Sequence, residues 1–281
     1  MTDTEKLLAP SQLGKTSEYT DQYNPELLFS LPRQLKRDEI QVATPLPFHG
    51  YDLWHAWEVS WLNPKGKPMV AVARIHIDCT SPNLIESKSL KLYLNSYNQT
   101  HFDSSEHVQK ILSQDLSQHC GHDVTLTLQP VTASSSLALQ ITHPPGCCLD
   151  TLDISVNQYH PNPKALIAAS DGPIISETVH SNLLKSNCLI TGQPDWGSVV
   201  IHYSGPKINH EGLLSYIISF RHHNEFHEQC VERIFMDLLK HCHCRTLTVA
   251  AYYTRRGGLD INPYRSNDNI APFTPSRLIR Q

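Results

Sequence analysis

Residues 90–97 read Leu-Lys-Leu-Tyr-Leu-Asn-Ser-Tyr, and a related stretch, Leu-Leu-Ser-Tyr-Ile-Ile-Ser-Phe, occupies residues 213–220. In both stretches the first, fourth, fifth and eighth positions are apolar or aromatic, which is the spacing of one face of a helix. The two stretches lie 123 positions apart. A helical face that returns at a long interval predicts a duplicated unit, and this duplication decides the fold.

A second helical stripe and a strand pattern repeat at the same offset. The matching positions are Val108, Ile111, Leu112 and Leu116 with Val231, Ile234, Phe235 and Leu239 for the helix, and Val124, Leu126 and Leu128 with Leu247, Val249 and Ala251 for the strand. Any two helix–helix–strand units can be slid into register, so coincidence is the alternative. One shared offset over three elements favours duplication.

A strand hairpin precedes the first pair of helices. Trp57, Val59 and Trp61 alternate with other residues, the Asn63–Gly66 segment has turn composition, and residues 69–79 alternate again. Each half therefore reads strand, strand, helix, helix, strand, with one further strand expected. Strands and helices are segregated along the chain, so we expect an α+β fold with antiparallel sheets.

The composition is that of a soluble globular protein. Of the 281 residues, 40% are hydrophobic, and 23 Lys and Arg against 27 Asp and Glu give a net charge of −4. This balance disfavours direct binding to nucleic acid. No apolar run is long enough for a transmembrane helix, and Met1–Lys15 lacks the apolar core of a signal peptide. We therefore expect a cytoplasmic protein whose eight cysteines are thiols.

Composition divides the chain into four segments. These are an N-terminal extension on the surface (1–40), a first module (41–135), a linker broken by Pro144-Pro145-Gly146 and Pro161-Asn162-Pro163 (136–172), and a second module (173–281).

Cys188 precedes Thr191-Gly192-Gln193-Pro194, a run that predicts a tight reversal of the chain. The reversal would let Asp195 face the thiol, and a nucleophile beside an acid is a catalytic arrangement. A single cysteine in a strand is more often an inert apolar residue. Local sequence alone leaves both interpretations open.

Glu228 falls in the first turn of a predicted helix. The helix dipole alone favours a carboxylate there. The functional alternative is a carboxylate that accepts paired N–H bonds from a guanine-like edge. His227 beside it is more often a structural polar residue than a catalyst. The corresponding place in the first half, Asp103 to Glu106, predicts only a capping box.

The run Arg255-Arg256-Gly257-Gly258 follows the last repeated strand. It is either a solvated turn or a basic loop that holds a phosphate together with Lys88. The chain has no G-x-G-x-x-G, so a dinucleotide is not held in the Rossmann manner.

The clusters His119–His122 and His241–Cys244 lack the spacing of structural zinc sites and are expected in loops just past a helix, so we expect no metal.

Four segments resemble the 7-cyano-7-deazaguanine reductases of queuosine biosynthesis, in their long, two-module subfamily. They are Glu86–Tyr93 (ESKSLKLY), Leu184–Trp196, Ser219–Glu232 (SFRHHNEFHEQCVE) and Tyr253–Arg265 (YTRRGGLDINPYR). The resemblance extends over nearly the whole chain, with no departure at these positions.

The resemblance implies tandem tunnelling-fold modules, each an antiparallel sheet carrying two helices, in a homodimer with sites between modules. It implies that Cys188 carries a covalent thioimide and that Asp195 donates a proton. The other residues that it implicates are Ile85, Glu86, Ser87, His227 and Glu228 for the deazaguanine base, and Ser87, Lys88, Arg256 and Gly257 for NADPH. Two NADPH are expected per turnover. The alternatives are a metal-dependent cyclohydrolase of the pterin type and a purine-binding module without catalysis.

Overall fold

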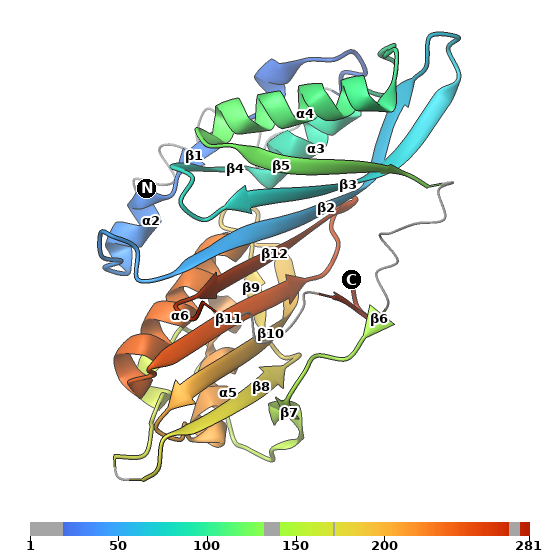
Figure 1. The fold of residues 1–281 in the computed structure, drawn as a ribbon. Helices are drawn as coiled ribbons and strands as arrows, with labels where there is room; N and C mark the ends of the chain where they lie inside the picture. The colour runs from blue at the N-terminus through green and yellow to red at the C-terminus, as the bar shows by residue number, and fades with distance from the viewer. Residues whose placement is uncertain (1–18, 132–140, 171, 270–275) are drawn as a thin grey trace. The chain divides into compact units, whose positions relative to one another are not determined.

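The computed structural model describes residues 19–131, 141–170, 172–269 and 276–281 (Figure 1). The chain forms two compact units. Unit 1 contains the described residues of 19–38, 51–131 and 255–261. Unit 2 contains those of 39–50, 141–254, 262–269 and 276–281. The architecture is mixed α+β with antiparallel sheet pairing in each unit, as expected.

Unit 1 is built on an antiparallel hairpin with a third strand, in the order β5-β3-β2. The strands are β2 (His49–Leu62), β3 (Pro68–Asp78) and β5 (Val124–Pro130). Asn63 begins the turn of the hairpin, where its side-chain oxygen accepts the N–H groups of Lys65 and Lys67 at 3.0 Å each. The predicted hairpin is therefore confirmed.

Two helices, α3 (Ser87–Asn95) and α4 (Ser105–Cys120), complete the repeat in unit 1. The apolar face predicted for α3 is buried, with Tyr93 and Tyr97 fully shielded from solvent. These side chains share one core with α4 and with the inward residues of the sheet. The 3.6-residue periodicity therefore identified the buried face of this helix correctly.

Unit 2 repeats the arrangement with more strands, in the order β12-β11-β10-β8-β7. They are β7 (Cys147–Cys148), β8 (Ile175–Ser181), β10 (Pro194–Gly205), β11 (Thr246–Tyr253) and β12 (Leu259–Ser266), of which residues 262–266 belong to unit 2. The short strand β9 (Lys185–Asn187) pairs with the start of β10. The helices are α5 (His210–Ile218) and α6 (His227–Cys242), joined by the 3-10 turn η4 (Ser219–His222). In this sheet β10 pairs antiparallel with β8, β9 and β11, β11 pairs antiparallel with β12, and β7 is parallel to β8. A separate parallel pair is formed by β6 (Ile141–Thr142) and β13 (Arg277–Leu278).

Both units contain the predicted pair of helices followed by a strand, but the offset between corresponding residues changes by one between the first helix and the second. Helix α5 begins at His210 and α3 at Ser87, an offset of 123, whereas α6 begins at His227 and α4 at Ser105, an offset of 122. The fully buried positions of the second helices agree with the smaller offset: Val108, Leu112, Leu116 and Cys120 against Cys230, Ile234, Leu238 and Cys242. The offset of 123 predicted for α6 is therefore wrong. Helix α6 is buried over a wide face that includes Val231 and Phe235, so its apolar residues fit an offset of either 122 or 123.

The N-terminal segment and the linker contain a further repeated feature. Residues 24–30 and 162–168 each start with Asn-Pro and form a short 3-10 turn, η1 (Pro25–Leu27) and η3 (Pro163–Ala165). The main-chain N–H groups of Asn24 and Asn162 donate to Ser96 and Ser219, both at 3.1 Å. The carbonyls of Phe29 and Ile167 then accept N–H bonds at 2.8 Å from Glu86 and Asn209, the residues that precede α3 and α5.

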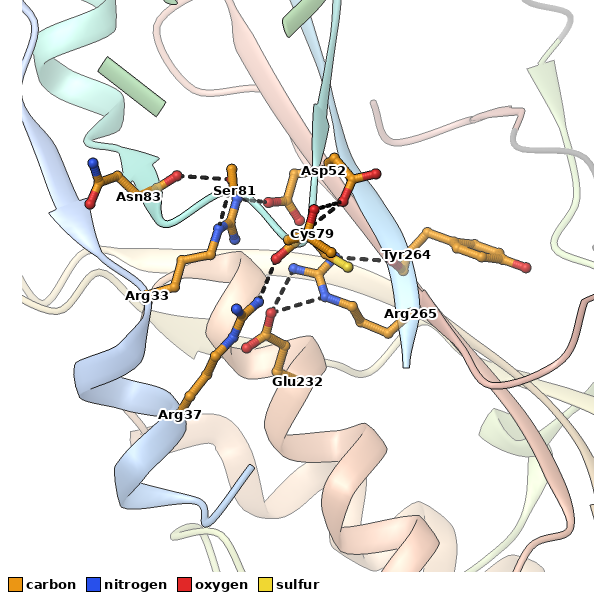
Figure 2. A network of polar contacts seen from close by, with 11 residues as sticks. Arg33, Arg37, Asp52, Cys79, Ser81, Asn83, Glu232, Tyr264 and Arg265 are labelled. Carbon is orange, nitrogen blue, oxygen red and sulfur yellow. Dashed lines mark hydrogen bonds and ion pairs between the residues drawn. The ribbon is translucent and has the colours of Figure 1, made fainter. Parts of the chain in front are cut away.

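The described part of the N-terminal segment is not the surface extension that the sequence suggested. Leu28 and Leu31 are buried. Arg33 donates to Asp52 at 2.6 Å and to Ser81 at 3.1 Å, and Arg37 donates to the carbonyl of Cys79 at 2.7 Å (Figure 2). These residues, which belong to unit 1, hold the segment in place.

Helix α4 begins one residue later than its predicted capping box. Its N-cap is Ser104, whose hydroxyl accepts the N–H of His107 at 3.2 Å, rather than Asp103. Asp and Ser are both favoured N-caps, so two adjacent candidates leave the position open in the sequence.

The two His/Cys clusters were predicted to lie in loops, but the first two residues of each cluster lie within a helix. Cys120 and Cys242 are the last residues of α4 and α6, and both are fully buried. Over the described ranges no three His, Cys, Asp or Glu side chains converge as metal ligands would. No helix in the same ranges is both long and apolar enough to cross a membrane.

Candidate active site

The loop after β9 contains Cys188 and has the predicted reversal. The N–H of Cys188 donates to the carbonyl of Gln193 at 2.8 Å, and the N–H of Gly192 returns to the carbonyl of Cys188 at 3.1 Å. Gly192 has a φ of +64°, a conformation that glycine adopts without steric cost. The thiol of Cys188 is half-buried. It therefore sits at the closed end of the β9–β10 hairpin.

Asp195 lies on the returning strand of this hairpin. Its Cα pairs with that of Ser186, two residues before Cys188, and its side chain is buried. One carboxylate oxygen lies 3.5 Å from Nε2 of His227, the first residue of α6. Asp195 therefore lies on the same hairpin as Cys188. Through His227 it also lies close to the start of α6, where Glu228 follows, although Asp195 and Glu228 are about 30 residues apart in the sequence.

His227 is stacked on Tyr253 at the end of β11. The ring centroids are 3.8 Å apart and the planes differ by 5°. His227 Nδ1 is buried and forms no hydrogen bond with any residue in the described part of the chain. Burial raises the pKa of Tyr253 well above that of an ordinary tyrosine, so its ring is neutral. Tyr253 was not predicted as a site residue, because no periodic pattern links it to α6.

Glu228 is the second residue of α6 and is only 2% exposed. The helix has no side-chain N-cap, since Phe226 occupies that position. The helix dipole accounts for a carboxylate in the first turn. It does not account for the burial, because an exposed carboxylate would meet the dipole without the desolvation cost.

Two residues before His227, Glu225 forms an ion pair with Arg233 of α6. Glu225 is 1% exposed and binds Arg233 through both carboxylate oxygens, at 2.7 and 3.0 Å. His223 Nε2 lies 2.8 Å from the same carboxylate. Burial alone would raise the pKa of Glu225, but the hydrogen bonds with His223 and Arg233 and their charges outweigh it and lower the pKa to about 2.

This depressed pKa predicts an acid-dependent stability. Ionised Glu225 stabilises the fold above the ordinary pKa of 4.5, and that contribution is lost as the pH falls from 4.5 towards 2. Between about pH 5 and pH 3, the free energy of unfolding should fall more in the natural protein than in Glu225→Gln, by on the order of 2 kcal/mol. Urea unfolding at several pH values measures this. Parallel pH curves for the two proteins would show that Glu225 is not ionised in the fold.

In unit 1, Glu86 is the N-cap of α3. Its two carboxylate oxygens accept the N–H groups of Lys88 at 2.7 Å and Ser89 at 2.8 Å. Glu86 is fully buried, and burial raises its pKa although these hydrogen bonds oppose the rise. Ile85, also buried, ends β4 (Asn83–Ile85), which pairs with β1 (Ser30–Pro32). The predicted base-contacting residues of this half therefore sit at the start of one helix.

The Arg255–Gly258 run lies between β11 and β12, and Gly257 and Gly258 form a two-residue turn. Arg256 and Leu259 exchange main-chain hydrogen bonds at 2.9 and 3.2 Å, and Gly257 and Gly258 have φ values of +57° and +82°. Both glycines take the left-handed conformation that this turn type requires. Arg255 is not simply solvated, since its guanidinium lies 4.5 Å from the ring centroid of Trp57.

A cavity of about 240 Å³ opens beside this turn in unit 1. Its polar lining comes from Glu58, Ser60, Lys91, Asn95 and Asn98, together with Gly257 and Gly258. A Cβ on Gly257 would lie 3.0 Å from the side chain of Lys91. Ser87 and Lys88 start the same helix, so the structure brings α3 and the Gly257 turn together. Lys91, one turn after Lys88, lines this cavity but was not among the residues predicted to bind the cofactor.

Comparison with known proteins agrees with the resemblance. A family profile described as "Nitrile reductase, 7-cyano-7-deazaguanine-reductase N-term" matches residues 19–128, and one described as "QueF-like protein" matches residues 194–271. A relative from Dechloromonas aromatica, named NADPH-dependent 7-cyano-7-deazaguanine reductase, is 55% identical over 96% of this chain and 95% of its own. The chain belongs to the 7-cyano-7-deazaguanine reductase family.

A second member of this reductase family, from Chromobacterium violaceum, bears the same name. It is 56% identical over 272 residues and covers 96% of each chain. A solved structure titled "Crystal structure of the archaeosine synthase QueF-Like in the apo form" is 13% identical and covers 36% of this chain and 100% of its own, with a TM-score of 0.31. Similarity at that level supports no inference about fold or function.

Proposed function

We propose that this reductase-family protein converts the nitrile of 7-cyano-7-deazaguanine to the aminomethyl group in queuosine biosynthesis, using two NADPH per turnover. The observation that carries the proposal is the β9–β10 hairpin, which has Cys188 at its closed end and, on its returning strand, the buried Asp195 at 3.5 Å from His227. Relatives more than half identical to the chain over nearly their whole length are named for this reduction.

The chemistry needs a nucleophile and an acid. A nitrile carbon is a poor hydride acceptor, but addition of the Cys188 thiolate converts it to a C=N thioimide. Asp195 protonates the nitrogen as general acid. NADPH, when bound, supplies a hydride for each of the two reductions. After the first, collapse breaks the C–S bond, expels the thiolate and leaves an imine. The second hydride, together with a second proton on the nitrogen, gives the amine.

The carboxylates of Glu86 and Glu228 are proposed to accept N–H bonds from the deazaguanine base. Glutamate is not among the favoured N-caps, so capping α3 does not explain its choice at position 86. The corresponding position in unit 2 is Asn209, which caps α5 with a shorter side chain. Each oxygen of Glu86 accepts one helix N–H and keeps a second acceptor site for a ligand. We also propose that His227 and Ile85 contact the base.

The residues around the Gly257 turn fit the phosphate of NADPH. A glycine at this point leaves room for close approach to the backbone. Arg256 on the turn, with Lys88 and Lys91 on α3, supplies positive charge from two elements. Ser87, the first residue of α3, adds a hydroxyl donor next to Lys88. Glu58 in the same cavity opposes anion binding and limits the phosphate to the side of the basic residues.

Arg256→Ala should raise the apparent KM for NADPH far more than that for NADH. The 2′-phosphate that distinguishes the two cofactors would lose a charge-assisted hydrogen bond, worth roughly 1.5–3 kcal/mol or a factor of about 10–150. Steady-state kinetics with both cofactors measure the split, and Arg255→Ala is the control because Arg255 stacks on Trp57. Equal changes for both cofactors would show that Arg256 does not contact that phosphate.

We further propose that the two repeats are tunnelling-fold modules, with boundaries near 41–135 and 173–281, and that the protein is a homodimer. The repeated helix pair supports the two modules, and each module is preceded by one of the repeated Asn-Pro segments, 24–30 and 162–168. The homodimer is implied by the resemblance alone. Sedimentation of the purified protein measures its oligomeric state, so it tests the homodimer independently of the reaction.

The reaction itself is tested by mixing the purified protein with the cyano-deazaguanine and NADPH. We expect the NADPH absorbance to fall and mass spectrometry to show the aminomethyl product, with two NADPH oxidised for each amine. Binding of the base without oxidation of NADPH would instead indicate a purine-binding module. Release of a hydrolysis product with a bound metal would indicate the cyclohydrolase.

A further inference from the structure

Two segments of unit 2 that precede proposed site residues are bonded directly to each other. Asn187, the residue before Cys188, donates its main-chain N–H to the carbonyl of His223 at 2.8 Å, and its carbonyl accepts the N–H of Glu225 at 3.1 Å. Asn187 and Asn224 form a parallel β-bridge. The strand that leads to the nucleophile is thus paired with the segment that leads to His227 and Glu228.

Side chains strengthen this pairing. The amide of Asn187 donates to Asn224 Oδ1 at 3.0 Å and to the carbonyl of Arg221 at 3.3 Å. Lys185 donates to the same Arg221 carbonyl at 2.7 Å and to Asn187 Oδ1 at 2.5 Å. Main chain and side chains therefore link the two segments at several adjacent residues, so one cannot slide along the other without breaking most of these bonds.

The carboxylate of Glu225 anchors the pairing to α6. It lies one residue past Asn224, is 1% exposed, and binds Arg233 of that helix with two hydrogen bonds. Two parallel bonds to a guanidinium fix orientation as well as distance. The contact of His223 at 2.8 Å fixes the preceding residues to the same carboxylate.

We propose that Glu225 is a positioning residue that, through its pairing with Asn187, sets where the Cys188 thiol stands relative to the start of α6. This inference rests on the proposed function and identifies a residue that does not itself touch the substrate. A nucleophile misplaced by about 1 Å can lose on the order of 100-fold in rate, because attack needs the reacting atoms in close, aligned contact. Glu225 therefore acts on covalent attack more than on affinity for the base.

The test compares Glu225→Gln, Glu225→Asp and Asn187→Ala with the natural protein. Glu232→Gln is the matched control, because Glu232 is an equally buried carboxylate on α6 that binds Arg265 at 2.9 and 3.0 Å (Figure 2). Three quantities are measured at a temperature where circular dichroism shows each variant folded. They are the rate of covalent adduct formation with the cyano-deazaguanine without NADPH, the Kd of guanine, and the rate of Cys188 alkylation by iodoacetamide.

Glu225→Gln and Asn187→Ala should slow adduct formation at least about 10-fold while the Kd of guanine changes less than about 3-fold and alkylation of Cys188 is not slowed. Glu225→Asp should recover part of the rate, and Glu232→Gln should retain it. Adduct formation at the natural rate in folded Glu225→Gln would overturn the proposal, as would equal slowing in Glu232→Gln. If the natural protein forms no adduct, the proposed function itself fails and this inference falls with it.

Discussion

Cys188→Ala is expected to abolish reduction of the nitrile while leaving the base bound. Without the thiol no thioimide forms, and the unactivated nitrile carbon does not accept hydride. The rate should fall by a factor on the order of 10⁴ or more, the scale seen when a covalent nucleophile is removed. Binding should persist, because the proposed contacts to the base come from other residues. NADPH oxidation and calorimetry with the cyano-deazaguanine measure the two effects separately.

The control for this variant is Cys147→Ala. Cys147 is an exposed thiol on β7, so it is more accessible than Cys188 but lies outside the candidate site. The control should keep the natural rate. Reduction by Cys188→Ala at the natural rate would rule out covalent catalysis and require direct hydride transfer to the nitrile.

Glu228→Gln is expected to weaken binding of the base by roughly 2–5 kcal/mol, or between about 30-fold and several thousand-fold in Kd. The substitution replaces one acceptor oxygen by an NH₂ donor that faces the donors of the guanine-like edge. The site is buried, so water does not compensate for the mismatch. Isothermal calorimetry with the cyano-deazaguanine measures the change.

Glu211→Gln is the matched control for Glu228→Gln. Glu211 is the second residue of α5 and the acidic residue of its first turn, so it has the same relation to its helix dipole. It should show no change in affinity. If Glu228→Gln also bound the base as tightly as the natural protein, Glu228 would be only a residue that favours the start of α6.

Much of the fold was predictable because periodicity reports burial directly. Strand β3 and helix α3 each have one buried side, so apolar residues recur at a single spacing. The register of α6 was not predictable in this way, because charged Glu228 and Glu232 are buried beside its apolar stripe and widen the buried face. The repeated segments at 24–30 and 162–168 were missed because a three-residue 3-10 turn has no period and these segments are 138 rather than 123 positions apart.

The candidate site was predictable where chain direction alone brings residues together. The Thr-Gly-Gln-Pro run indicated the reversal that puts Cys188 and Asp195 on one hairpin. Contacts between distant segments have no such signal: the stack of His227 on Tyr253 joins a helix start to a strand end. The capping role of Glu86 was missed for a different reason, since glutamate is a poor indicator of a helix start.

The most direct test of the account is intact-mass spectrometry of the natural protein mixed with 7-cyano-7-deazaguanine in the absence of NADPH. Addition of the thiolate to the nitrile needs no hydride, so the reaction should stop at the thioimide. We predict a mass equal to the protein plus one substrate, with the label on the peptide that contains Cys188 and absent from Cys188→Ala. An unmodified mass, under conditions where the base binds and NADPH is oxidised when added, would contradict covalent catalysis by Cys188.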